Sequence, residues 1–170
     1  MKRLFLLALL FVAGTGSLSA QNYMVVDSEK VFKSIDDYNT AIDLLNELAK
    51  AYQEQVNAKF DEVESLYNDY MEQKNSLSSY SQSVRENLIT QKEQEAIEYQ
   101  ESIFGKEGAL MKKRLELIQP IQKKVFDAIE QYATSNGYDL VLDSAANPTM
   151  LYKSEKVDQT DAVIELLKKQ

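Results

Sequence analysis

The feature that most constrains this chain is a long stretch that separates two strand-like segments. Residues 23–27 (YMVVD) and 138–143 (YDLVLD) are short and rich in β-branched and apolar residues, as expected of strands. About a hundred residues lie between them, and the first proline in that stretch is Pro120. Because the apolar residues there recur every three or four positions, the stretch is predicted to be helical and to divide one small domain.

Two apolar stripes run through this helical region. The spacings of the first alternate between three and four, which is typical of one continuous helix with a seam like that of a coiled coil. It consists of Tyr38, Ile42, Leu45, Ala49, Tyr52, Val56, Phe60, Val63, Tyr67, Tyr70 and, after a gap, Leu77. The second consists of Ile89, Ala96, Ile103 and Leu110 at intervals of seven, with Phe104 and Met111 alongside, then Leu115, Ile118, Ile121, Val125, Ile129 and Tyr132.

Two stripes of similar length favour an antiparallel helical hairpin over residues 37–119. Its tip is predicted near 76–83, because this segment is rich in serine, which favours turns and caps. Ser83 and Glu86 have the spacing of a capping box for the returning helix. One unbroken helix with a polar patch is the alternative. Gly105 and Gly108 predict a bend in the returning limb, and Pro120 predicts a kink.

Residues 22–36 and 120–170 are predicted to form a small discontinuous body, so that the fold class is α+β. Asp27 or Ser28 can cap a short helix after the first strand, and Gly137 can close the returning helix in the left-handed conformation. A third strand is expected at residues 149–153 (TMLYK) after a loop at 144–148. A last helix is expected from a cap at Asp158 or Thr160.

Such a body has a marginal core. Three short strands leave exposed edges, and a chain without cysteine has no disulfides to hold it, so several copies are expected to assemble through a β-rich body. The residues predicted to take part in oligomerisation are Val25, Val26, Leu140, Val141, Leu142, Met150 and Leu151.

The N-terminus has the pattern of a cleaved secretory signal peptide at residues 1–20. Lys2 and Arg3 precede an apolar run at 4–13 and a stretch of mostly small residues at 14–20. The apolar run is too short to span a bilayer, which needs about twenty residues. Cleavage is predicted after Ala20, with a retained anchor as the alternative.

Charge and composition argue against two classes of function, nucleic acid binding and enzyme catalysis. The chain has 19 basic and 27 acidic residues; two of the basic ones, Lys2 and Arg3, lie in the predicted signal peptide, which leaves 17 and a net charge of about −10. Nucleic acid binding needs clustered lysine and arginine and is not expected. Without histidine or cysteine, the commonest general base, the usual zinc ligands and the thiol nucleophile are missing. The chain is not expected to be an enzyme, and no catalytic, cofactor-binding or metal-binding residue is assigned.

Several segments together carry a resemblance to a known family. They are residues 29–32 (EKVF) after the opening strand, the helical hairpin, residues 117–122 (LIQPIQ), residues 136–143 (NGYDLVLD) and the terminal residues 160–167 (TDAVIELL). In order and length this chain resembles the Skp/OmpH family of periplasmic chaperones. The resemblance implies a periplasmic homotrimer, in which a trimerisation body joins three helical arms, or tentacles, around a cavity that holds unfolded outer-membrane proteins.

The charge of this chain departs from that family. Its best-known members are strongly basic, whereas residues 27–72 here carry a net charge of about −8 and residues 104–127 about +3. The two limbs of the hairpin are therefore expected to attract each other. No lipopolysaccharide site is carried over, and contact with a membrane surface is not expected of so acidic a chain.

The leading hypothesis is an ATP-independent holdase that keeps unfolded outer-membrane proteins from aggregating. Flexible methionine and tyrosine side chains suit promiscuous binding. The candidate client contacts near the arm ends are Tyr70, Met71, Leu77, Tyr80, Leu88 and Ile89. Each of them can instead belong to the seam between the two helices. The alternative from another class is a structural coiled-coil spacer or adaptor in the envelope.

Overall fold

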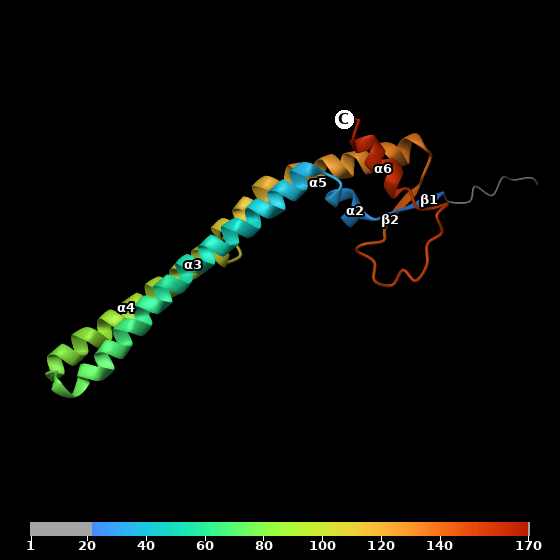
Figure 1. Cartoon of the computed structure of the whole chain (residues 1–170). Helices are drawn as coiled ribbons and strands as arrows, with labels where there is room; N and C mark the ends of the chain where they lie inside the picture. Colours follow the sequence, from blue (N-terminus) through green and yellow to red (C-terminus); the bar gives the residue numbers. More distant parts are fainter. Residues whose placement is uncertain (1–21, 170) are drawn as a thin grey trace, which may run out of the picture. The chain divides into compact units, whose positions relative to one another are not determined.

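The computed structural model describes residues 22–169, and the predicted signal peptide lies outside them (Figure 1). The chain is mostly helical with one small sheet. Its elements are β1 (Tyr23–Val26), α2 (Ser28–Lys33), α3 (Asp36–Gln73), the 3₁₀ turn η1 (Lys74–Ser76), α4 (Ser79–Phe104), α5 (Ala109–Ser135), β2 (Leu140–Asp143) and α6 (Thr160–Leu167).

Backbone contacts divide the chain into two compact units. The arm unit comprises Glu29–Asp127, and the body unit comprises the described residues up to Ser28 together with those from Ala128. The predicted boundaries were at 36/37 and 119/120, so each boundary differs by eight residues. The two units are described separately below.

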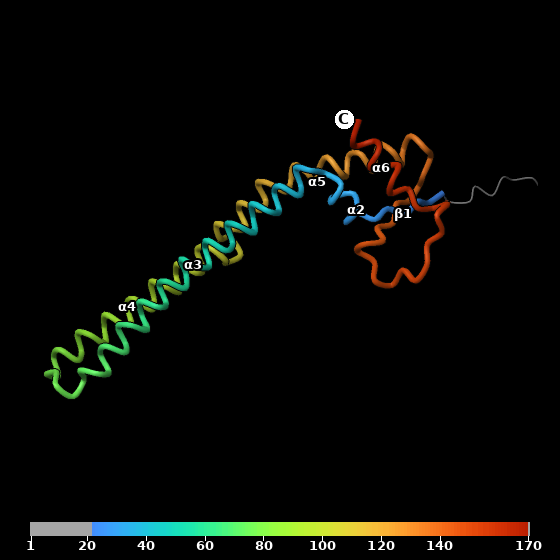
Figure 2. The backbone as a smooth tube through the Cα atoms, in the orientation of Figure 1, coloured from blue at the N-terminus to red at the C-terminus, as the bar shows by residue number. Residues whose placement is uncertain are grey.

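In the arm unit, α3 and α4 lie side by side and run antiparallel (Figure 2). Glu62 of α3 forms an ion pair with Lys92 of α4 at 3.1 Å, and Tyr99 of α4 donates a hydrogen bond to Gln55, further from the turn. Most of the buried residues follow the predicted seam, namely Leu45, Val56 and Tyr70 in α3 and Ala96 and Ile103 in α4; the buried Ala41 of α3 is not one of the predicted seam residues. The chain therefore turns back instead of continuing as one helix.

The turn itself lies at residues 74–78. Ser78 is the N-cap of α4, and its hydroxyl accepts a hydrogen bond from the Ser81 amide at 3.1 Å. The predicted capping box of Ser83 and Glu86 is wrong, because both residues lie inside α4. The segment offers several serines as caps, and the pattern alone could not select among them.

The returning limb is interrupted where a bend was predicted. α4 ends at Phe104 and α5 begins at Ala109. A Cβ atom on Gly105 would lie 2.5 Å from the carbonyl oxygen of Glu101, and one on Gly108 would lie 2.3 Å from that of Ile103. Both glycines are therefore required by close backbone approaches.

Helix α5 continues through Pro120. It is unbroken from Ala109 to Ser135, so the proline neither ends the helix nor marks the boundary between the units. The proline removes one backbone donor, but the apolar residues on both sides of it pack against α3. The buried cluster there consists of Ala41, Leu45 and Ile118, with Tyr38, Ile42, Leu110, Leu117 and Ile121 packed against it.

The body unit contains a parallel pair of strands. β1 pairs with β2 in a register that places Tyr23 opposite Leu140 and Val26 opposite Asp143. Parallel strands need a crossover connection, and the whole arm supplies it. The predicted third strand at 149–153 is wrong, because the other edge of β1 is taken: Val25 donates to the Val157 carbonyl at 2.8 Å and accepts from the Gln159 amide at 2.9 Å. The body is therefore less rich in strand than expected.

In the body unit, a backbone cap ends α5 and a side chain helps to cap the start of α2. Gly137 has a φ of 68°, and the Tyr138 amide donates to the Ala133 carbonyl at 2.9 Å, which confirms the predicted left-handed cap. At the start of α2, the Asp143 carboxylate in β2 accepts hydrogen bonds from both the amide and the hydroxyl of Ser28, so a side chain distant in sequence helps to cap this helix.

Candidate functional site

Large apolar side chains are exposed on the returning limb of the arm unit. Far from the turn they are Ile97 (45% exposed) and Phe104 (37%) in α4 and Met111 (43%), Leu115 (46%) and Phe126 (58%) in α5, while Tyr80, Val84 and Leu88 are exposed in α4 nearer the turn. We call the five residues far from the turn the return-limb stripe. Ile97 and Phe104 are seven residues apart and share one face of α4, and the three members in α5 likewise share one face.

The stripe lies beside the seam and not in it. Ala96 and Ile103, each one position before a stripe residue, are buried, and the next residue on a helix is rotated by about 100°. The spacing predicts Phe104 and Met111 alongside the seam and Leu115 within it, but in the structure all three are exposed. The available signal was a second apolar column at Ile97, Phe104 and Met111. Together with the seam residues, this column makes an apolar face that is wider than contact with one helix requires.

The charges near the stripe are arranged mainly within helices. Lys113 pairs with Glu116 at 2.8 Å and Lys123 with Asp127 at 2.6 Å, both within α5. Attraction across the limbs is carried by Lys92 of α4, whose pKa is raised by its hydrogen bond to Glu62. The expected electrostatic pairing of the limbs thus occurs in α4 and not through these two lysines of residues 104–127.

Near the turn, the predicted client residues divide into two groups. Tyr70 is buried between the limbs at 3% exposure, while Leu77 and Ile89 are half-buried. For Tyr70 the alternative interpretation as a seam residue fits. Met71 (48%), Tyr80 (80%) and Leu88 (41%) are exposed.

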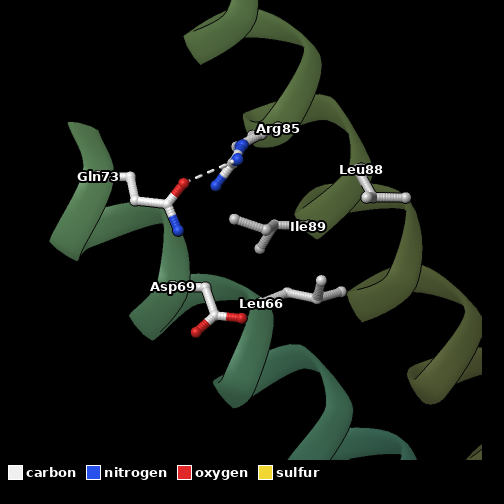
Figure 3. Close-up of a pocket in the computed structure, with 6 residues that line it drawn as sticks. All are labelled: Leu66, Asp69, Gln73, Arg85, Leu88 and Ile89. Carbon is white, nitrogen blue, oxygen red and sulfur yellow. Dashed lines mark hydrogen bonds between the residues drawn. The ribbon is translucent and has the colours of Figure 1, made fainter. Parts of the chain in front are cut away.

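A groove of about 300 Å³ lies between the limbs close to the turn (Figure 3). At one end of it, the guanidinium of Arg85 donates a hydrogen bond to the Gln73 side-chain oxygen at 3.0 Å. The residues that line the groove are Leu66, Asp69, Gln73, Arg85, Leu88 and Ile89. Leu88 and Ile89 are thus the predicted client residues that share one concave surface.

The predicted oligomerisation residues also differ in exposure. Val25 and Val26 are buried within the body unit at 2% and 1%. Leu140 is 52% exposed and Leu151 is 97% exposed, while the remaining three, Val141, Leu142 and Met150, are half-buried. A hollow of about 320 Å³ in the same unit is lined by Tyr23, Val25, Leu142, Met150, Tyr152, Lys153, Ser154 and Val157.

Residues 22–169 contain neither a candidate metal site nor a candidate membrane-spanning helix. Within that range no group of three or more acidic side chains is placed to hold a metal ion. No helix in the same range is long and apolar enough to cross a bilayer.

Comparisons with known proteins agree with this architecture. The family model described as outer membrane protein (OmpH-like) matches residues 22–167. A crystal structure from Caulobacter crescentus CB15, described as an OmpH-like outer membrane chaperone, superposes with a TM-score of 0.64 at 12% identity and covers 92% of this chain and 89% of that one. No curated protein sequence matches the chain. The family match over nearly all of the described residues confirms the expected relationship, and the chain belongs to the OmpH-like family.

Proposed function

We propose that the protein is an ATP-independent periplasmic holdase that binds unfolded outer-membrane proteins and prevents their aggregation. The observation that carries this proposal is the return-limb stripe, with five large apolar side chains between 37% and 58% exposed. Exposed apolar surface of this kind marks interaction sites, because water is displaced from it when a partner binds. The family match supports the chaperone class.

The arrangement suits many weak contacts with varied clients. The stripe is spread along two helices, so each client segment would gain only a small free energy at each residue. Met71, Tyr80 and Leu88 near the turn, which stay candidate client contacts, extend the same kind of surface. The interruption at Gly105 and Gly108 gives the returning limb a place where its two helices can adjust to a client.

A homotrimer would place several arms around one client. We propose that copies associate through the body unit, and that Leu140, Leu142, Met150 and Leu151 contribute side chains to the contact. Leu151, at 97% exposure, is the most exposed of the large apolar side chains in the described part of the body, and the hollow lined by Leu142 and Met150 can receive such a side chain. Val25 and Val26, which are buried, would then stabilise the sheet within each copy and would not themselves contact another copy.

Light scattering of an unfolded outer-membrane β-barrel, with and without the purified protein, tests the holdase. The variant Ile97→Ser, Phe104→Ser, Met111→Ser and Leu115→Ser removes most of the stripe; Phe126 is kept because its ring lies 6.5 Å from that of Phe32. We expect half-suppression of aggregation to need on the order of a hundredfold more of this variant, because at least the equivalent of one buried methylene is lost at each of four positions. Stoichiometric wild-type protein that leaves aggregation unchanged would contradict the proposal.

The matched control carries four serines at exposed polar positions of the same limb: Asn87→Ser, Gln100→Ser, Gln119→Ser and Gln122→Ser. It should suppress aggregation as the wild type does. A coiled-coil spacer or adaptor would instead recover one or two folded partners in a pull-down from envelope extracts, whereas a holdase would recover many unfolded proteins.

A further inference from the structure

We propose that Met71 and Met111 are sites of reversible oxidation, and that their conversion to methionine sulfoxide by peroxide or hypochlorous acid weakens client binding. This inference rests on the proposed function, since it concerns the regulation of the same surface.

Methionine carries all of the sulfur in this chain. There are five methionines and neither cysteine nor tryptophan. An oxidant that reaches the protein therefore finds no thiol to attack first, and the thioether is the most readily oxidised side chain present.

Exposure separates the methionines that the structure describes. Met71 is 48% exposed and Met111 is 43% exposed, whereas Met24 is 0% exposed and Met150 is half-buried. Met24 lies in β1, paired with Val141, where the added oxygen of a sulfoxide would disrupt the body core. The residue whose oxidation would damage the fold is thus shielded, and the two most accessible thioethers lie outside the core.

Both accessible thioethers lie in the surface proposed to hold clients. Met111 is between Phe104 and Leu115 in the return-limb stripe, and Met71 lies near the turn, one helical turn after the exposed Tyr67 in α3. A sulfoxide turns a flexible apolar side chain into a polar one, so burying it against a client costs the desolvation of its oxygen. The helices that carry these two residues would keep their conformation.

The chemical step is an oxygen transfer. A lone pair of the thioether sulfur attacks one oxygen of hydrogen peroxide, the O–O bond breaks, and the sulfoxide and one water molecule form. The reverse step uses a methionine sulfoxide reductase, in which two thiols are oxidised to a disulfide and the sulfoxide oxygen leaves as water.

The experiment uses the full mature chain treated with graded hydrogen peroxide. Mass spectrometry of peptides measures sulfoxide at each methionine, and circular dichroism checks that the helices are retained. We expect Met71 and Met111 to be oxidised before Met24, and half-suppression of client aggregation to need about fourfold more protein for each oxidised thioether, which corresponds to losing one buried methylene. Treatment with two methionine sulfoxide reductases, one for each epimer of the sulfoxide, should restore the original value.

The variant Met71→Leu, Met111→Leu is the matched control, because leucine has a similar volume and stays apolar but cannot be oxidised. Its holdase activity should be unchanged by peroxide. The inference is overturned if Met71 and Met111 are fully oxidised without loss of activity, or if the leucine variant loses as much activity as the wild type. Untreated protein that does not suppress aggregation would refute the proposed function itself, which separates the two failures.

Discussion

The hydroxyl of Tyr70, near the end of α3, donates a hydrogen bond to the carboxylate of Glu86 on the returning helix α4. The bond to Glu86 raises the pKa of Tyr70 above its ordinary value, and the Lys74 ammonium lies 5.2 Å from the centre of the same ring. Lys74 also lies 4.0 Å from Glu86. These three side chains join the two limbs directly behind the turn.

Replacing Tyr70 with phenylalanine should loosen the turn without unfolding the arm. The ring stays buried, but the Glu86 carboxylate loses its donor from the opposite limb. We expect the amides of residues 74–82 to exchange with deuterium roughly twofold to tenfold faster, as the loss of one hydrogen bond would cause. Tyr80→Phe is the control, since Tyr80 is 80% exposed. Equal exchange in both variants would show that the Tyr70 hydroxyl does not hold the limbs together.

Alanine at Gly108 should destabilise the arm strongly. The added Cβ would lie 2.3 Å from the Ile103 carbonyl oxygen, which is backbone and cannot move aside cheaply. We expect the free energy of unfolding in urea to fall by about 2–4 kcal/mol, as for other changes that overpack a buried site. Lys106→Ala, in the same interruption, adds no atom to the backbone and should cost little. A Gly108→Ala protein as stable as Lys106→Ala would mean that the break tolerates a side chain.

Acid should weaken the body unit through Asp158. Burial raises the pKa of this carboxyl, but the hydrogen bonds and charge of Lys153 and the hydrogen bonds from Thr160 lower it more, to about 2. Because the folded pKa lies below the ordinary 3.8, the carboxylate stabilises the fold above about pH 4, and that contribution is lost as the pH falls towards 2. We expect a loss on the order of 1–2 kcal/mol.

Thermal unfolding followed between pH 2 and pH 6 measures this effect. Asp158→Asn should have a lower melting temperature at pH 6 and a flatter dependence on pH than the wild type. Glu155→Gln, an exposed change nearby, should keep the wild-type profile. Identical pH profiles for the wild type and Asp158→Asn would remove Asp158 as the cause.

An acidic residue at Leu151 should prevent association of the body if the proposed homotrimer forms there. Leu151 is 97% exposed in the single chain, so Leu151→Asp disturbs no packing within it but would place a charge in an apolar contact. We expect the mass measured by light scattering after size exclusion to fall from three copies to one. Glu155→Ser should keep the wild-type mass, and an unchanged mass for Leu151→Asp would place any contact elsewhere.

Some elements followed from local chemistry and were therefore predictable. The left-handed cap at Gly137 depends on a single glycine, which adopts a positive φ without strain. The strand at residues 140–143 was predictable from the alternation of its own side chains. The strand expected at 149–153 failed because pairing is not local: residues 157–159 occupy the edge of β1 that it would need. The cap of α4 likewise went to Ser78 and not to Ser83, because several serines could serve.

The candidate site shows the same division. The amino-acid pattern was enough to predict a long helical insert between two strands, since spacing along one helix reports which residues share a face. It also contained both adjacent apolar columns, Ala96 with Ile103 and Ile97 with Phe104. Tertiary packing buries the first column and leaves the second exposed, and this could not be predicted because periodicity defines angles within a helix and not the position of its partner.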